Sequence, residues 1–214
     1  MNEWLLKKIN WFTGCIAILF LFGLIALAAN VEIKDVDLWL HLAVGKYIVT
    51  NFSIPKVDIL SCTILNTPWI NHEWLFQAIV YSVYNTAGTD GLVSLKAWVI
   101  LLTFAFLLFL GHTREYRIGP MAVLLLVLLV YQFRMTLRPD IFSLIFFVLY
   151  AAIPISKRWS LWVVALIQIV WTNMHGFFIL GPVIILVGLI GEWIKRNATL
   201  PHEWKNTGRL SDEE

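Results

Sequence analysis

A dense group of polar and ionisable residues lies near the start of this apolar chain. Asp37 and His41 are four residues apart, so on a helix their side chains would share one face. A carboxylate beside an imidazole is suited to accept a proton from a reacting hydroxyl, or to bind a cation. Asp35 is better explained as a residue that caps the start of the same helix. For Asp37, capping and chemistry explain the sequence equally well.

A second polar group, Asn71-His72-Glu73, immediately precedes an apolar segment that starts at Trp74. Asn and Glu are common in the first turn of a helix, so capping explains Asn71 or Glu73 but gives no role to His72. Trp74 is typical of the aromatic belt at a membrane surface. In a carbohydrate enzyme, the same ring would stack on a sugar.

A third group, Arg138-Pro139-Asp140, combines a helix start with charge. Proline and aspartate are both favoured in the first turn of a helix, which explains Asp140 without any chemistry. In a functional interpretation, Arg138 binds a phosphate and Asp140 joins Asp37 around a reacting hydroxyl or a divalent metal, Mg or Mn.

Asn173 and His175 end a later apolar segment. Polar groups in such a place usually face a partner or a cavity rather than lipid. The candidate catalytic residues are therefore Asp37 and Asp140, which are also the candidate metal ligands. The candidate substrate-binding residues are His41, His72, Glu73, Arg138, Asn173 and His175.

The composition indicates what positions these residues. The chain has 214 residues, of which 59% are hydrophobic and 14% charged, and its mean hydropathy is +0.77. These values predict an all-α integral membrane protein. The net charge of +2 reflects basic loops, and no basic and aromatic stripe indicates a nucleic-acid partner. Cys15 and Cys62 imply neither a disulfide framework nor a zinc site.

The distribution of apolar segments divides the chain into four parts. Residues 1–30 are predicted to form a transmembrane anchor, 31–90 a long exterior loop with amphipathic juxtamembrane helices, 91–194 a transmembrane helix bundle, and 195–214 a polar tail. About six to seven transmembrane helices are expected in all. Their apolar segments after the loop run from about Leu92 to Leu110, Ile118 to Phe133, Ile141 to Ile155, Leu161 to Trp171 and Phe177 to Ile194.

Two segments of the exterior loop have a predicted structure. The segment from Trp74 to Tyr84 is short enough either to cross the membrane or to lie at its surface, and residues 85–91 break it from the next helix. A helix from Val36 to Thr50 is expected to be amphipathic. Its lipid-facing residues would be Leu38, Leu42, Tyr47 and Ile48, and its groove-facing residues would be Asp37, His41 and Gly45.

The distribution of Lys and Arg predicts the topology, because cytoplasmic loops collect these residues. If the Trp74 segment does not cross, all the basic clusters lie inside with the N-terminus: Lys7/Lys8, Arg114/Arg117, Lys157/Arg158 and Lys195/Arg196. The candidate site residues then all lie on the exterior face. Arg134 and Arg138 also lie there, which is tolerable if they serve an anion-binding site.

The order of these motifs resembles a known group of membrane proteins. The runs Asp35-x-Asp37-x-Trp39-x-His41, Pro68-Trp-x-Asn71-His72-Glu73, Leu137-Arg-Pro139 and Trp171-x-Asn173-x-His175-Gly176 are similar to the N-terminal half of uncharacterised bacterial multi-pass proteins related to GT-C glycosyltransferases. The resemblance covers residues 32–181. The sequence departs from it at Leu40, where a tryptophan is common, and members of the group are usually longer.

The resemblance implies a function and a location. It implies a helical GT-C-like module in the bacterial inner membrane that transfers a sugar from a polyprenyl-phosphate donor to a lipid, glycan or protein acceptor. Asp37 matches the acidic residue of the first exterior loop and Asp140 the acidic residue of the second. Arg138 would contact the phosphate of the donor.

Two other functions are compatible with the sequence. The chain could be a non-catalytic or truncated GT-C-like subunit that packs in a larger membrane complex. Its many Trp and Phe residues support this alternative. It could also bind a metal or haem through His41, His72 and His175. These histidines lie at the ends of apolar segments, whereas haem ligands for electron transfer across a membrane are expected within them.

Overall fold

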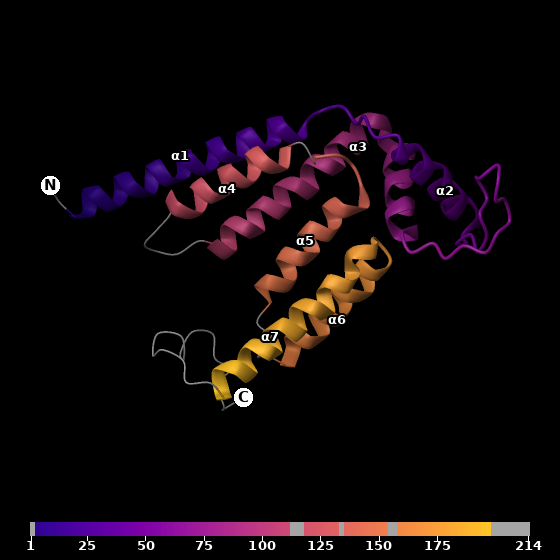
Figure 1. Cartoon of the computed structure of the whole chain (residues 1–214). Coiled ribbons are helices and arrows are strands. Elements are labelled where there is room, and N and C mark those ends of the chain that lie inside the picture. Colours follow the sequence, from indigo (N-terminus) through magenta and orange to yellow (C-terminus); the bar gives the residue numbers. More distant parts are fainter. Residues whose placement is uncertain (1–2, 112–117, 133–134, 154–157, 198–214) are drawn as a thin grey trace.

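The computed structural model describes residues 3–111, 118–132, 135–153 and 158–197, and this part of the chain is helical without any β-strand (Figure 1). Residues 198–214 of the predicted tail and Arg134 of the predicted outer turn lie outside it. The helices are α1 (Glu3–Ala29), α2 (Asp37–Asn51), α3 (Trp74–Gly111), α4 (Ile118–Tyr131), α5 (Pro139–Ala152), α6 (Arg158–Thr172), the 3₁₀ helix η2 (Gly176–Ile179) and α7 (Leu180–Asn197).

Three of the helical stretches are long and apolar enough to cross a membrane: 12–29, 74–111 and 176–197. Helices α4 and α5 have 14 residues each and α6 has 15. At 1.5 Å per residue they reach only about 21–23 Å, which is less than the roughly 30 Å thickness of the hydrocarbon core. The expected all-α membrane protein is therefore consistent with the structure, which has three helical stretches able to cross a membrane.

Helix α3 is broken within the segment where the sequence predicts a break. Gly88 has φ 62° and ψ −154°, which are not helical angles and which residues with a side chain rarely adopt. The part of α3 before Gly88 packs beside α2, and the part after it runs back alongside α1 and α4 (Figure 1). The break therefore turns the chain from the loop region into the bundle.

Helix α2 packs differently from the amphipathic surface helix that the sequence predicts. Leu38, Leu42 and Ile48 were expected to face lipid, but all three are buried inside the protein. Gly45 was expected to face a groove, but it lies against Gln77 and Tyr81 of α3. The prediction was wrong because an apolar helix face looks the same in sequence whether it packs on lipid or on another helix.

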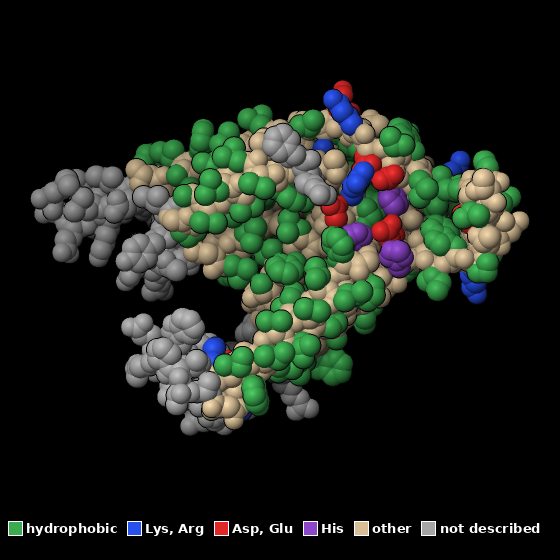
Figure 2. All heavy atoms as spheres, viewed as in Figure 1, with side chains coloured by type: hydrophobic (Ala, Val, Ile, Leu, Met, Phe, Trp, Pro, Cys, Tyr) green, Lys and Arg blue, Asp and Glu red, His purple; other side chains and the backbone are tan. Residues whose placement is uncertain are grey.

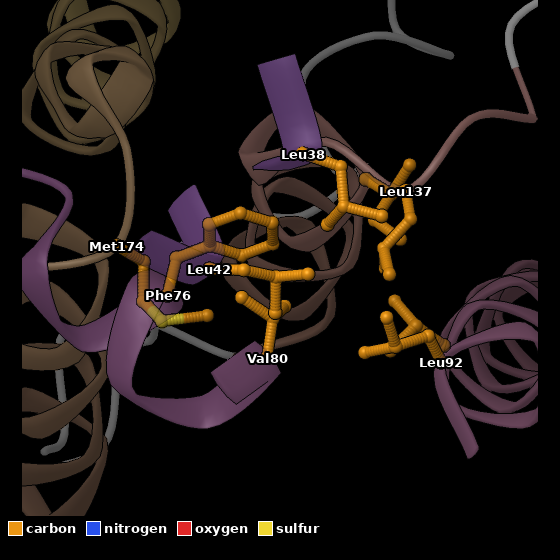
Figure 3. Close-up of a cluster of buried hydrophobic side chains, with 9 residues drawn as sticks. Leu38, Leu42, Phe76, Val80, Leu92, Leu137 and Met174 are labelled. Carbon is orange, nitrogen blue, oxygen red and sulfur yellow. The ribbon is translucent and has the colours of Figure 1, made fainter. Parts of the chain in front are cut away.

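The buried face of α2 belongs to one hydrophobic cluster (Figure 3). It joins Leu38 and Leu42 of α2 to Phe76 and Val80 of α3. The remaining buried members are Leu92, Val99, Leu137, Ile141 and Met174. The cluster therefore brings α2, α3, α5 and the turn after α6 to one place, although these segments are far apart in sequence.

The close approach of α2 and α3 at Gly45 gives a first prediction. An added Cβ at this position would lie 2.1 Å from the carbonyl oxygen of Gln77 and 2.7 Å from Cβ of Tyr81. Since one of these neighbours is backbone, Gly45→Ala should push the helices apart and destabilise the protein by about 1–3 kcal/mol. The matched control is Gly23→Ala on α1, where an added Cβ has no neighbour within 4 Å. Thermal unfolding in detergent, followed by tryptophan fluorescence, should show a lower melting temperature for Gly45→Ala alone.

Candidate functional site

A polar pocket of about 300 Å³ lies where α2, the start of α3 and the start of α5 meet. It is lined by Asp37, Leu40, His41, Glu73, Arg138 and Pro139. In Figure 2, acidic, basic and histidine side chains gather on one part of a largely apolar face. Four of the sequence-predicted site residues therefore line one pocket: Asp37, His41, Glu73 and Arg138.

Arg138 binds two carboxylates at the edge of this pocket. Its Nε and Nη2 donate to Asp35, the latter over 3.0 Å, and Nη2 also lies 3.2 Å from Oδ2 of Asp37. The side chain of Asp35 is 2% exposed and that of Asp37 is 66% exposed. The hydrogen bonds from Arg138 hold the pKa of Asp35 below its usual value.

Asp35 has more than the capping role that the sequence predicts. Val36 rather than Asp35 is the N-cap residue of α2, but Oδ1 of Asp35 accepts a hydrogen bond over 3.1 Å from the backbone N–H of Asp37, the first residue of the helix. Its pairing with Arg138 was missed, because no local pattern connects residues that are 103 positions apart. Asp35 is thus the buried anchor, and Asp37 presents the exposed carboxylate of the pocket.

His41 is a buried and neutral member of the pocket. Its Nδ1 lies 3.5 Å from the amide nitrogen of Gln77, whose Oε1 accepts a hydrogen bond from Asn71 over 2.6 Å. Because the amide N–H₂ of Gln77 donates, Nδ1 accepts and the ring proton is on Nε2. Burial lowers the pKa of His41, although Asp37 partly opposes this. Gln77 was missed because a single Gln in an apolar segment carries no sequence signal of its own.

Glu73 is the second carboxylate that lines the pocket. Its Oε1 lies 3.7 Å from Nε2 of His72 and 4.0 Å from Nε2 of His175. Burial raises the pKa of Glu73, and the nearby His72 opposes the shift. His72 is itself about half exposed, whereas His175 is mostly buried behind the pocket. Glu73 therefore lies between two histidines that come from different parts of the chain.

Four predicted site residues do not line the pocket: His72, His175, Asn173 and Asp140. Asn173 joins the end of α6 to the start of α3, because its Oδ1 accepts from the indole of Trp74 over 2.6 Å and its carbonyl accepts from Leu75 N–H over 3.1 Å. Asp140 lies near Arg138 and His175, and its buried Oδ1 has no hydrogen-bond partner within the described residues. A role for any of the four in substrate binding or catalysis stays a prediction.

The predicted Mg or Mn site stays a prediction. Within the described residues, no three His, Cys, Asp or Glu side chains gather closely enough to hold a metal ion. Asp37, one of the two expected ligands, is already paired with Arg138.

Comparisons of the chain with protein-family models, curated proteins and solved structures find no significant match.

The burial of Asp35 predicts a pH-dependent stability. Because Arg138 lowers the pKa of Asp35 in the folded protein, the ionised pair stabilises the fold above the unfolded-state pKa of about 4, and this contribution is lost as the pH falls below that value. Asp35→Asn should therefore cost about 1–3 kcal/mol at pH 7, and this cost should shrink as the pH falls through the lowered folded-state pKa of Asp35. Asp37→Asn is the control, because its carboxylate is exposed. Equal losses for the two variants in equilibrium unfolding at pH 7 would contradict the assignment of Asp35 as the anchor.

Proposed function

We propose that this chain is a GT-C-like glycosyltransferase module that transfers a hexose or pentose from a polyprenyl-phosphate donor to a hydroxyl acceptor. The observation that carries the proposal is the exposed carboxylate of Asp37, which Arg138 holds in a polar pocket next to apolar helices. Such a pocket can admit the polar headgroup of a lipid-linked substrate while its chain stays in the membrane. The order of motifs from Asp35 to Gly176 supports the same assignment.

The pocket supplies the two charges that this transfer needs. Asp37 accepts the proton of the acceptor hydroxyl as the hydroxyl oxygen attacks the anomeric carbon of the sugar. The bond between that carbon and the phosphate oxygen then breaks, and the phosphate leaves with its negative charge. Arg138, whose side chain is 46% exposed, has further N–H donors with which it can stabilise this charge. In this step Asp37 therefore takes the proton of the acceptor, and Arg138 stabilises the charge of the leaving phosphate.

The proposal includes a topology. We place the N-terminus in the cytoplasm of a bacterium and the pocket on the outer face of the inner membrane, as the distribution of Lys and Arg favours. Of the predicted six to seven crossings, α4, α5 and α6 would be short ones that need local thinning of the bilayer. The part of α3 before Gly88 would then lie near the membrane surface with α2.

One observation favours the alternative of a non-catalytic subunit in a larger membrane complex. In α7 only Gly181 is buried, and large side chains such as Val187 and Trp193 are exposed. A face of this kind suits lipid, and it also suits a partner membrane subunit. The glycosyltransferase needs the pocket for chemistry, whereas the non-catalytic subunit does not.

Replacing the proposed base separates these functions. Asp37→Asn keeps the shape of the side chain but cannot take a proton, so sugar transfer should fall by about 10²–10⁴-fold. Transfer would be measured with radiolabelled polyprenyl-phosphate hexoses and pentoses and bacterial membrane extracts as acceptors. The matched control is Asp90→Asn, an exposed carboxylate that does not line the pocket. If the Asp37→Asn variant transfers sugar at the rate of the unchanged protein, Asp37 is not the base.

The topology has its own test. In a Cys15→Ser, Cys62→Ser background, single cysteines at Thr113 and Ser156, both outside the described residues, should stay protected from a membrane-impermeant maleimide in intact cells. The exposed Cys62, restored alone, should react because it lies in the exterior loop. Labelling of positions 113 and 156 from outside would reverse the proposed orientation.

A further inference from the structure

A row of polar side chains runs from the interior of the protein to the pocket. The indole Nε1 of Trp171 lies 2.9 Å from Oγ of Ser143, and this Oγ lies 2.8 Å from Nδ1 of His175. The other ring nitrogen of His175, Nε2, lies 4.0 Å from Oε1 of Glu73. Trp171 is fully buried and Ser143 is 4% exposed. The row therefore connects a core tryptophan to a carboxylate that lines the pocket.

The chemistry of the first member fixes the direction of the others. An indole N–H can only donate, so Ser143 accepts from Trp171. The hydroxyl of Ser143 has a second lone pair and could also accept from His175, but within the described residues its proton has no acceptor other than Nδ1 of His175, which favours donation to that nitrogen. A neutral imidazole that accepts at Nδ1 carries its proton on Nε2, the nitrogen that faces Glu73. Each donor in the row thus points toward the pocket.

We propose that Ser143 and Trp171 are positioning residues that hold His175 as the Nε2–H tautomer, so that His175 is a hydrogen-bond donor toward Glu73. Resting on the proposed function, the consequence is that Glu73 is kept as an anion able to accept a hydrogen bond from a substrate hydroxyl. The 4.0 Å between Nε2 of His175 and Oε1 of Glu73 is longer than a hydrogen bond, and we expect it to shorten when a substrate orders the pocket, as catalytic hydrogen bonds often do on binding. Chains of hydrogen bonds also strengthen one another in a buried setting.

The groups around His175 keep it neutral. Burial lowers its pKa, the nearby Asp140 opposes the shift, and His72 adds to it. The ring of Phe177 packs edge-on against His175 with the ring centres 4.4 Å apart, so its orientation is also fixed. In a neutral and fixed imidazole, donation from Ser143 to Nδ1 selects the tautomer that carries its proton on Nε2.

The surroundings of Glu73 explain why a donor is needed there. Burial disfavours the Glu73 anion and raises its pKa, and His72 at 3.7 Å compensates only in part. Of the other charged groups of the pocket, Arg138 is hydrogen-bonded to Asp35 and also contacts Asp37. His41 is buried, neutral and held by Gln77. A hydrogen bond from His175, formed once the 4.0 Å separation of Nε2 and Oε1 closes, would support the ionised form of Glu73.

The tautomer is directly measurable by nitrogen NMR. Protein labelled with ¹⁵N-histidine would be compared as the unchanged chain, Ser143→Ala, Trp171→Phe and the control Ser82→Ala, whose hydroxyl bonds only its own helix at the carbonyl of Ala78. In the unchanged chain and the control, Nδ1 of His175 should resonate as an unprotonated, hydrogen-bonded nitrogen. In Ser143→Ala and Trp171→Phe its resonance should move to that of a free nitrogen or average with the Nδ1–H form. A His175→Gln sample assigns the signal.

The outcomes separate this proposal from the proposed function. A proton on Nδ1 in the unchanged chain, or an Nδ1 signal that both variants leave in place, overturns the positioning role. If the signals behave as expected but no sugar is transferred, the row stands and the glycosyltransferase assignment fails. If transfer occurs, Ser143→Ala should raise KM for the donor by about tenfold with little change in kcat, which corresponds to one hydrogen bond to a charged group. Should Trp171→Phe fail to fold, the smaller change at Ser143 still decides the question.

Discussion

The ion pair between Arg138 and Asp35 is the constraint on which the site depends. It connects the segment after α1 to the start of α5 across 103 residues, and its carboxylate is almost fully buried. A buried carboxylate is unstable without a partner, so the two segments cannot separate without a large cost. Because Asp35 also accepts the backbone N–H of Asp37, the same pair determines where α2 begins. The position of Asp37 in the pocket follows from both bonds.

The polar groups are held in place by apolar neighbours in the sequence. Leu38 follows Asp37, Leu137 precedes Arg138 and Met174 precedes His175, and all three apolar residues are buried in the cluster of Figure 3. A buried side chain fixes the backbone of the residue next to it, because interiors are close-packed. The cluster therefore aligns residues from three segments without any of their polar groups having to be buried in the core.

The sequence predicts some of this arrangement for clear physical reasons. The apolar segments, the break near Gly88 and the shared face of Asp37 and His41 follow from helix geometry and glycine chemistry, and the structure contains them. The inner face of α2 was not predictable, because apolar periodicity does not distinguish lipid from protein. Ser143 and Gln77 were missed for another reason. The role of a single small or amide side chain in an apolar helix depends on its hydrogen-bond partner, and that partner is known only from the fold.

The difference between Asp35 and Asp37 shows how burial assigns roles to similar residues. Both carboxylates bind the same guanidinium, but their side chains are 2% and 66% exposed. The buried one has no room for a substrate, and protonating it would remove a bond that holds two segments together. The exposed one is already solvated by water, so its contact with Arg138 contributes little to the stability of the fold. Of these two carboxylates, Asp37 is therefore the one that a substrate in the pocket can reach.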